Sequence, residues 1–288
     1  MARNAFTLLP ARLEDVPVLA EISSASFATD VQTEMKSHGK SPFNMKEYAL
    51  SSLPGELASP KIRIIKAVER DTGNIMGFCT WGFRGVEPPE CIIPGGEVFN
   101  TSAHEAQRPG EGITETNPDT VNANDQDART EKGSEQSAQT ESMSMSPKDK
   151  DKDNNVEVND DPIARLEAFT GQDFQTWLDT IMPSGTGTET SCLFIIGLYV
   201  SPGFQKRGVG SALLKWGTDL VDFHGVFAWV HSSDGAWRVY ERVGFRTVKT
   251  LEVDLDEYAP VPAPKERYEG GKWGKYCFRY MVYGAVPT

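Results

Sequence analysis

The stretch from Leu193 to Phe223 constrains the fold of this chain more than any other part of the sequence. It begins with an uninterrupted apolar run that ends at Val200 and is followed by a Pro-Gly turn. The β-branched and aromatic residues of this run, and its lack of polar alternation, predict a strand that is buried on both faces. After a glycine-rich loop, apolar residues recur at helical spacing and predict a helix that stops near Gly225. The residues with this spacing are Leu213, Trp216, Leu220 and Phe223.

The loop between these two elements, Gln205 to Gly210, has the composition of an anion-binding site. Gly208 and Gly210 let the backbone adopt unusual dihedral angles and let a ligand approach the peptide N–H groups closely. The first turn of the helix adds unpaired N–H donors and the positive end of the helix dipole. Together with the side chains of Lys206 and Arg207, these donors predict a site for a phosphate or a diphosphate.

The spacing of the glycines excludes two common nucleotide-binding loops. Gly203 and Gly208 are separated as in a Walker A loop, but Val209 and Gly210 stand where that loop needs Lys and Ser or Thr. A dinucleotide-binding fingerprint that begins at Gly208 requires Gly or Ala at position 213, where this chain has Leu213.

The stretch resembles motif A of the GNAT superfamily of acyl-CoA N-acyltransferases, in which a Gln/Arg-x-x-Gly-x-Gly/Ala loop follows a central strand. Gln205, Gly208 and Gly210 match this loop in place. The family's second signature, Ala-x-x-x-Tyr-x-x-x-Gly-Phe, is matched over residues 236–245. The family often has Asn three residues before that Ala, and this chain has Ser233 there.

The resemblance implies an α/β fold with a mixed sheet of the α+β kind, whose central strands splay apart between flanking helices. It also implies acetyl-CoA as the acyl donor, with the strand's backbone near Val200 holding the pantetheine amides and the thioester carbonyl, and the loop's N–H groups holding the diphosphate. The implied contacts are Leu198, Tyr199, Val200, Gln205, Lys206, Arg207, Gly208, Val209, Gly210, Ser211 and Ser233. Gly197, inside the same strand, indicates a bulge, a close approach of the ligand, or simple close packing.

Tyr240 stands in the second signature, where the family usually has its acid. A phenol with a pKa near ~10 is a weaker acid than a thiol near ~8.5, so full proton transfer to the leaving thiolate is uphill by roughly 2 kcal/mol. We therefore expect Tyr240 to donate a hydrogen bond to the thiolate as its charge develops. The alternative is that Tyr240 only packs on its helix face.

The sequence does not single out a general base. An alkylamine with a pKa near ~10.4 is almost fully protonated at neutral pH, so its proton must be removed before it can attack. Glu69, His231 and a chain of water molecules remain open alternatives for this step. Phe27, Tyr48 and Trp81 could line an acceptor pocket, although aromatic residues that face a core need no such explanation.

Composition separates a central stretch from the rest of the chain. Between Thr101 and Asp160 there are fourteen acidic residues against six basic ones, and no Phe, Trp or Tyr. So few large apolar groups cannot offset the ordering entropy, roughly 1–2 kcal/mol per residue for the backbone. We therefore expect one N-acetyltransferase domain in two parts, 1–84 and 161–288, that are separated by an acidic, low-complexity, disordered insertion at 85–160.

Periodicity and turn residues place the remaining elements. Strands are expected at 6–9, 61–69, 75–83, 225–233, 245–255 and 276–283, the last at an exposed or lightly covered sheet edge. Helices are expected after Asp15 as the cap, at 44–53 with Pro54 as the stop, at 162–181 as an added element, and at 234–243. The segments 29–42 and 256–264 are expected to be irregular.

Several classes of ligand and location are not expected. The net charge is −12 and no basic stripe is present, so nucleic acid is an unfavourable partner. The four cysteines form no Cys-x-x-Cys pair and no metal-spacing motif with the histidines, so we expect no metal. Neither a signal peptide nor a membrane span is indicated, and the expected location is the cytoplasm, with the nucleus as an alternative.

The function that follows is direct transfer of acetyl from acetyl-CoA to a primary amine of a small molecule or a protein, without a covalent enzyme intermediate. The acidity of the domain favours a cationic acceptor, such as a polyamine, another amino compound or a lysine side chain. The alternative is a non-catalytic, CoA-binding regulatory protein on the same fold, with the acidic insertion as a partner-binding arm. The oligomeric state is left open.

Overall fold

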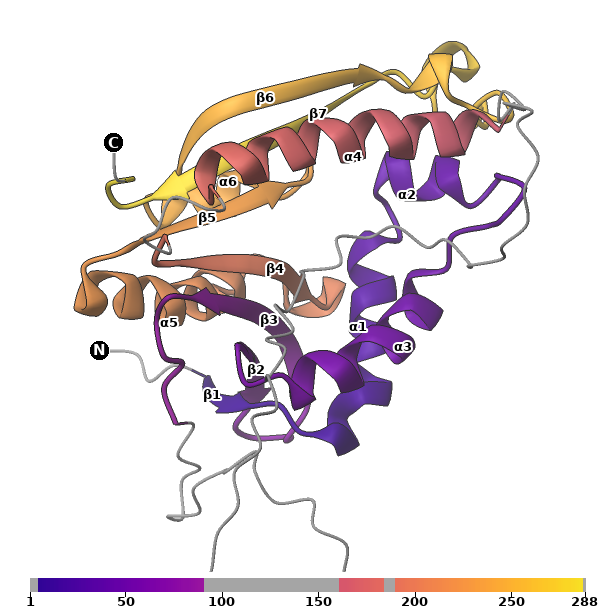
Figure 1. Ribbon diagram of the computed structural model, residues 1–288. Helices are drawn as coiled ribbons and strands as arrows, with labels where there is room; N and C mark the ends of the chain where they lie inside the picture. Colours follow the sequence, from indigo (N-terminus) through magenta and orange to yellow (C-terminus); the bar gives the residue numbers. More distant parts are fainter. Residues whose placement is uncertain (1–4, 91–160, 184–189, 287–288) are drawn as a thin grey trace, which may run out of the picture. The chain divides into compact units, whose positions relative to one another are not determined.

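In the part of the chain that the structure describes, seven strands form a single mixed sheet in the order β1-β2-β3-β4-β5-β7-β6 (Figure 1). The computed structural model describes residues 5–90, 161–183 and 190–286, which all belong to one compact unit. β4 and β5 run parallel, and the other neighbouring strands run antiparallel. The strands are β1 (Phe6–Pro10), β2 (Ile62–Glu69), β3 (Ile75–Arg84), β4 (Cys192–Val200), β5 (Phe227–Ser232), β6 (Arg246–Asp254) and β7 (Lys275–Tyr283). This mixed sheet confirms the predicted fold class.

Helices cover both faces of the sheet. α5 and α6 pack on one face, against a large apolar cluster built on β3, β4 and β5. α1 and α3 cover β2 and β3 on the other face, where α4 covers β5 and β7 (Figure 1). The α-helices are α1 (Val16–Phe27), α2 (Val31–Lys36), α3 (Met45–Ala58), α4 (Pro162–Ile181), α5 (Val209–His224) and α6 (Trp237–Arg242).

The two parallel strands diverge halfway along β4. They pair only between Cys192–Ile195 and Phe227–Val230. Beyond that point, residues 197–200 of β4 pair with β3 alone, and the register between β3 and β4 shifts at Ile196. The edge of β4 that faces β5 is therefore free of a strand partner from residue 196 to residue 200, which confirms the predicted splay of the central strands.

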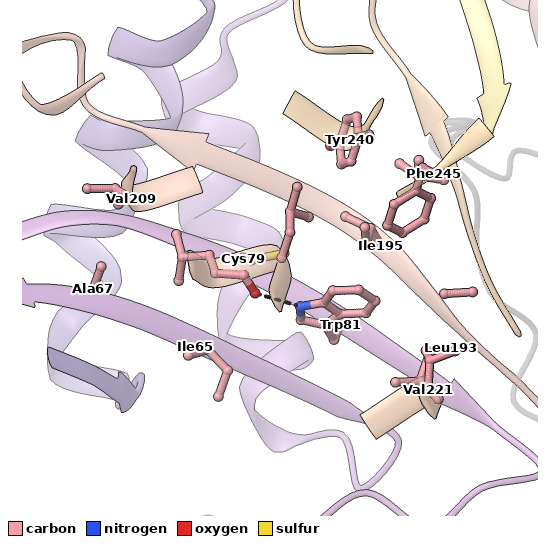
Figure 2. Packing of buried hydrophobic residues seen from close by; sticks show 14 of the residues in the cluster. Ile65, Ala67, Cys79, Trp81, Leu193, Ile195, Val209, Val221, Tyr240 and Phe245 are labelled. Atoms are coloured by element: carbon pink, nitrogen blue, oxygen red, sulfur yellow. Dashed lines mark hydrogen bonds between the residues drawn. The ribbon is translucent and has the colours of Figure 1, made fainter. Parts of the chain in front are cut away.

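The strand, loop and helix predicted around the glycine-rich loop are present as β4, residues 201–208 and α5. α5 starts after Gly208, at φ +84°, and ends at Gly225, at φ +64°, where a left-handed residue stops the helix. Its packing on the sheet depends on Gly217, because a Cβ there would lie 2.2 Å from the ring of Trp81. The indole Nε1 of Trp81 donates a hydrogen bond to the Leu213 carbonyl at 3.4 Å, shown dashed in Figure 2.

The helix predicted at 162–181 is present as α4 and packs on the second half of the sheet. Asp161 caps it by accepting a hydrogen bond from the Ile163 N–H at 3.0 Å. Trp177 lies 5.0 Å, between ring centroids, from Tyr280 of β7. α4 therefore buries one face of β5 and β7.

Four local predictions were wrong, three because of contacts between distant segments and one, at α2, because a local capping signal was missed. α3 continues through Pro54 to Ala58, since its apolar stripe extends from Leu53 to the partly buried Leu57. The segment 29–42, expected to be irregular, contains α2, which Asp30 caps through the Thr33 N–H at 2.9 Å. β7, expected at an edge, lies inside the sheet because β6 pairs on its outer side.

The fourth concerns Asp15, which makes no capping bond to α1. Its carboxylate accepts instead from the Arg12 N–H at 2.7 Å and from the Lys66 ammonium at 2.5 Å. The predicted disordered insertion falls, from residue 91 to residue 160, outside the described residues.

Candidate active site

The loop before α5 presents a row of unused backbone donors. Within the described residues, none of the backbone N–H groups from Lys206 to Ser211 bonds to another backbone group. Lys206 has φ +60° and Gly208 has φ +84°, so left-handed residues stand on both sides of Arg207, whose φ is negative. Alternating conformations of this kind turn successive N–H groups towards one concave surface, which binds anions, and the α5 dipole adds to it. The loop geometry therefore fits a phosphate or a diphosphate.

Space for such a ligand exists beside Gly208. A Cβ built on Gly208 would meet no heavy atom within 4 Å, whereas one on Gly210 would lie 3.4 Å from Val239 of α6. Gly208 therefore borders open space, and Gly210 lets α5 approach α6.

The three side chains that precede Gly208 have different partners. The Gln205 amide donates to the Val200 carbonyl at 3.2 Å and so ties the loop to the end of β4. The Arg207 guanidinium bonds to the Glu69 carboxylate at 3.1 Å and lies 5.1 Å from the Phe204 ring. In the described part of the chain Lys206 has no ion-pair partner, so its charge is the one left available to an anion.

Tyr240 lies on α6, buried against β4, with its ring 5.8 Å from Phe245 (Figure 2). Burial raises the pKa of its phenol well above the ordinary value, and the neighbouring Cys79 and Tyr199 add to the rise. No hydrogen-bond partner of its hydroxyl is found among the described residues. The geometry leaves this hydroxyl able to donate a hydrogen bond but makes it a poor source of a free proton.

A polar cluster that the sequence does not predict lies on the opposite face of β4. Tyr48, Ser52 and Glu56 repeat every four residues along one stripe of α3 and approach the β3 residue Thr80 and the β4 residue Tyr199. This i, i+4, i+8 spacing is visible in the sequence, but only the packing of α3 on the sheet shows that the stripe faces inwards. Burial raises the pKa of Glu56, and the hydroxyls of Thr80 and Ser52 act in the opposite direction.

The Tyr199 ring is fixed in place between α1 and the sheet. It stacks on Phe78 of β3 at 4.7 Å and lies 5.8 Å from Phe27 of α1. It also covers Gly197, where a Cβ would be 2.3 Å from the ring. Close packing, next to the bulge at Ile196, thus accounts for this glycine.

The other predicted site residues lie in different surroundings. Ser233 follows β5, and its hydroxyl lies close to that of Tyr276. Glu69 already accepts hydrogen bonds from Arg207 and from Thr72, the latter at 2.8 Å. Trp81 belongs to the core under α5 and does not line a pocket.

His231 faces α4, packed among the rings of Phe174, Phe278 and Tyr280 at 4.6–5.1 Å. Its Nε2 is buried and has no hydrogen-bond partner among the described residues. Burial lowers the pKa of His231 to about 4, although the Asp173 carboxylate acts in the opposite direction. A substrate has no direct access to this nitrogen.

Two kinds of feature are absent from the described residues. No three side chains of His, Cys, Asp or Glu lie close enough together to hold a metal ion. None of the helices in these ranges is long and apolar enough to cross a membrane.

Comparison with known proteins gives one family and a set of structures. The family model of the GNAT acetyltransferases matches residues 128–245. Similar solved structures include a Corynebacterium glutamicum protein described as histone acetyltransferase HPA2 and related acetyltransferase (14% identity, TM-score 0.45, covering 99% of both chains). Others are the mosquito arylalkylamine N-acetyltransferase like 5b (14%, 0.46, 96% of this chain and 98% of that one) and the Drosophila melanogaster polyamine N-acetyltransferase (12%, 0.46, 97% and 100%). No relative was found among the curated proteins.

Proposed function

We propose that this chain, which the family model of the GNAT acetyltransferases matches over residues 128–245, transfers an acetyl group from acetyl-CoA directly to a primary amine of a small molecule or a protein. The observation that most directly supports acetyl-CoA as the acyl donor is the run of unused N–H groups from Lys206 to Ser211 beside the free edge of β4. A diphosphate needs clustered donors, and a pantetheine arm needs a strand edge with free amides. The loop and β4 offer both next to each other.

Particular residues would hold the donor. The N–H groups of the loop would bind its diphosphate, and the Lys206 ammonium would add charge. Along β4, the Val200 carbonyl already accepts hydrogen bonds from Ser26 at 3.1 Å and from Gln205. The backbone groups of Leu198 and the N–H of Val200 would therefore make most of the contacts to the pantetheine arm, because Tyr199 directs its carbonyl towards Gly77 of β3.

The thioester of acetyl-CoA supplies an activated acyl group, and the protein must orient it and stabilise the departing thiolate. We assign this second role to the Tyr240 hydroxyl. Its raised pKa opposes full proton transfer and favours a hydrogen bond that strengthens as charge develops on sulfur. Tyr240 is thus proposed as a hydrogen-bond donor to the leaving group.

Replacing Tyr240 by Phe tests this assignment. The variant keeps the buried ring and loses only the hydroxyl, so we expect turnover with acetyl-CoA and a panel of primary amines to fall roughly tenfold or more. CoA affinity, measured by calorimetry, should not change. Equal turnover in the variant and the wild type would remove Tyr240 from the mechanism.

Gly208→Glu tests the donor site. The new carboxylate would occupy the open space beside the loop and repel the diphosphate, so CoA affinity should fall by roughly tenfold or more. The matched control is Gly270→Glu, where φ is also positive (+67°), a Cβ also meets no neighbour and the net charge changes equally. Undiminished CoA affinity in Gly208→Glu would refute the site.

The second candidate function, a CoA-binding regulatory protein, predicts a different outcome. CoA would bind with the same dependence on Gly208, but no amine would release thiol from acetyl-CoA. The Tyr240 hydroxyl, which is free of other hydrogen bonds within the described chain, favours the enzyme.

A further inference from the structure

A half-buried carboxylate without a counter-charge lies under the splayed end of β4. Glu56 is on the last turn of α3, on the stripe that it shares with Tyr48 and Ser52. Within the described residues, no Lys or Arg pairs with it. The other carboxylates close to the splay are engaged, since Glu69 binds Arg207 and Asp173 binds Lys249 at 2.7 Å. An uncompensated carboxylate in such a place is unfavourable unless a cation joins it.

An unpartnered hydroxyl lies beside this carboxylate. Thr80 is 1% exposed, and its Oγ1 makes no hydrogen bond of normal geometry within the described chain. It is nevertheless close enough to Glu56 to influence that carboxyl. A buried polar atom of this kind normally has a partner, and a ligand could supply it.

Tyr199 connects this cluster to the proposed reaction centre. It lies on the half of β4 that does not pair with β5, and its ring covers Gly197, the ladder partner of Thr80. Burial and then the Glu56 carboxylate raise the pKa of Tyr199, and Tyr199 in turn contributes to the raised pKa of Tyr240. The cluster of Glu56, Thr80 and Tyr199 is therefore next to the place where the acetyl group would be presented.

We propose that Glu56 binds the protonated amino group of the acceptor and accepts its proton, and that Thr80 and the rings of Tyr48 and Tyr199 hold the rest of the molecule. The acceptor would accordingly be a cationic primary amine with an apolar or aromatic body. Carboxylate and aromatic faces together favour such a ligand, through a charge-assisted hydrogen bond and cation–π contacts. This inference rests on the proposed acetyl transfer.

Both protons that the amine nitrogen loses are accounted for. The ammonium gives one proton to the Glu56 carboxylate and becomes a neutral amine, whose nitrogen forms the new C–N bond as the C–S bond breaks. The second proton lost by nitrogen leaves with the thiol, and Glu56 returns its own proton to water. Burial raises the pKa of Glu56 and so brings it closer to the pKa of the ammonium, which makes this proton transfer easier.

The test uses the full chain saturated with CoA and 2-phenylethylamine as the probe. Glu56→Gln removes the charge and keeps the shape, so calorimetry should show phenylethylamine binding weakened by roughly 10- to 100-fold. The control is Glu47→Gln, an exposed acid on the same helix, which should bind like the wild type. Thr80→Val should weaken binding in the same direction, with CoA affinity unchanged.

A pH profile separates the proposed role from a structural one. In Glu56→Gln, kcat/KM for the amine should fall by roughly 100-fold or more near neutral pH. The deficit should shrink as the pH approaches the amine's own pKa, ~10.4, because the amine is then neutral in solution. A merely structural defect would persist across this range.

The outcomes distinguish this inference from the proposed function. If Glu56→Gln binds and acetylates the amine as well as Glu47→Gln does, or if the wild type binds no amine, the acceptor site is wrong while the donor site is unaffected. If phenylethylamine binding depends on Glu56 but no acetyl is transferred, the acceptor site stands and the enzymatic function fails.

Discussion

At the scale of single residues, position relative to the splay separates the acids and bases of this chain. Glu56 and His231 both lie on the side of the sheet that is opposite α5. Glu56 is half-buried beside an unpartnered hydroxyl, whereas His231 is enclosed by aromatic rings under α4. Of the two bases suggested by the sequence, Glu69 is engaged with Arg207 and His231 is enclosed. The residue proposed above to take the proton from the acceptor amine is instead Glu56.

His231 should make stability depend on pH. Its pKa is about 4 in the folded protein and about 6.5 when unfolded, so between these values only the unfolded chain binds the proton. The contribution of neutral His231 to the free energy of unfolding is therefore fully present above about pH 6.5. It decreases towards pH 4, by up to about 3 kcal/mol. Urea unfolding at pH 7.5 and at pH 4.5 measures this loss.

Two variants assign the pH effect to its residue. His231→Phe should lack most of this loss, while His224→Gln, at an exposed position, should keep it. An equally steep loss in His231→Phe would mean that other groups titrate.

At the scale of elements, the contact between α5 and β3 sets the position of the anion-binding loop. The ring of Trp81 fills the space that a side chain at position 217 would need, and its indole bonds to the α5 backbone. Since the loop leads directly into α5, this contact also positions the N–H groups at the start of the helix.

Two Gly→Ala variants should therefore have opposite effects on stability. Gly217→Ala would overpack the contact with Trp81 and should destabilise the fold by about 1–3 kcal/mol. Gly171→Ala, inside α4 with no neighbour within 4 Å of the new Cβ, should stabilise it by about 1 kcal/mol. Urea denaturation gives both values, and a neutral Gly217→Ala would show that α5 can shift on the sheet.

At the scale of the whole molecule, the described sheet and its helices are continuous without the acidic stretch. β3 ends before it, α4 begins after it, and both pack into the same unit. The sequence assigns this stretch no core residues because it lacks large apolar groups.

Deletion of residues 101–160 should therefore leave folding and CoA affinity unchanged. The melting temperature and calorimetric CoA binding of the shortened chain are the measurements. A large drop in melting temperature would show that the stretch belongs to the fold, and a lost function with intact CoA binding would favour a role in binding partners.

The sequence alone determined the strand, loop and helix around Gly208 and the short helix that carries Tyr240, because periodicity, glycine spacing and a local signature need no distant contacts. Only the tertiary structure decided that β7 is interior, that α3 runs through Pro54 and that the stripe ending at Glu56 faces the splay. Each of these depends on which segments, far apart in the chain, exclude water from one another. The residues next to a strand or a carboxylate in the sequence do not determine which strand it pairs with or how deeply it is buried.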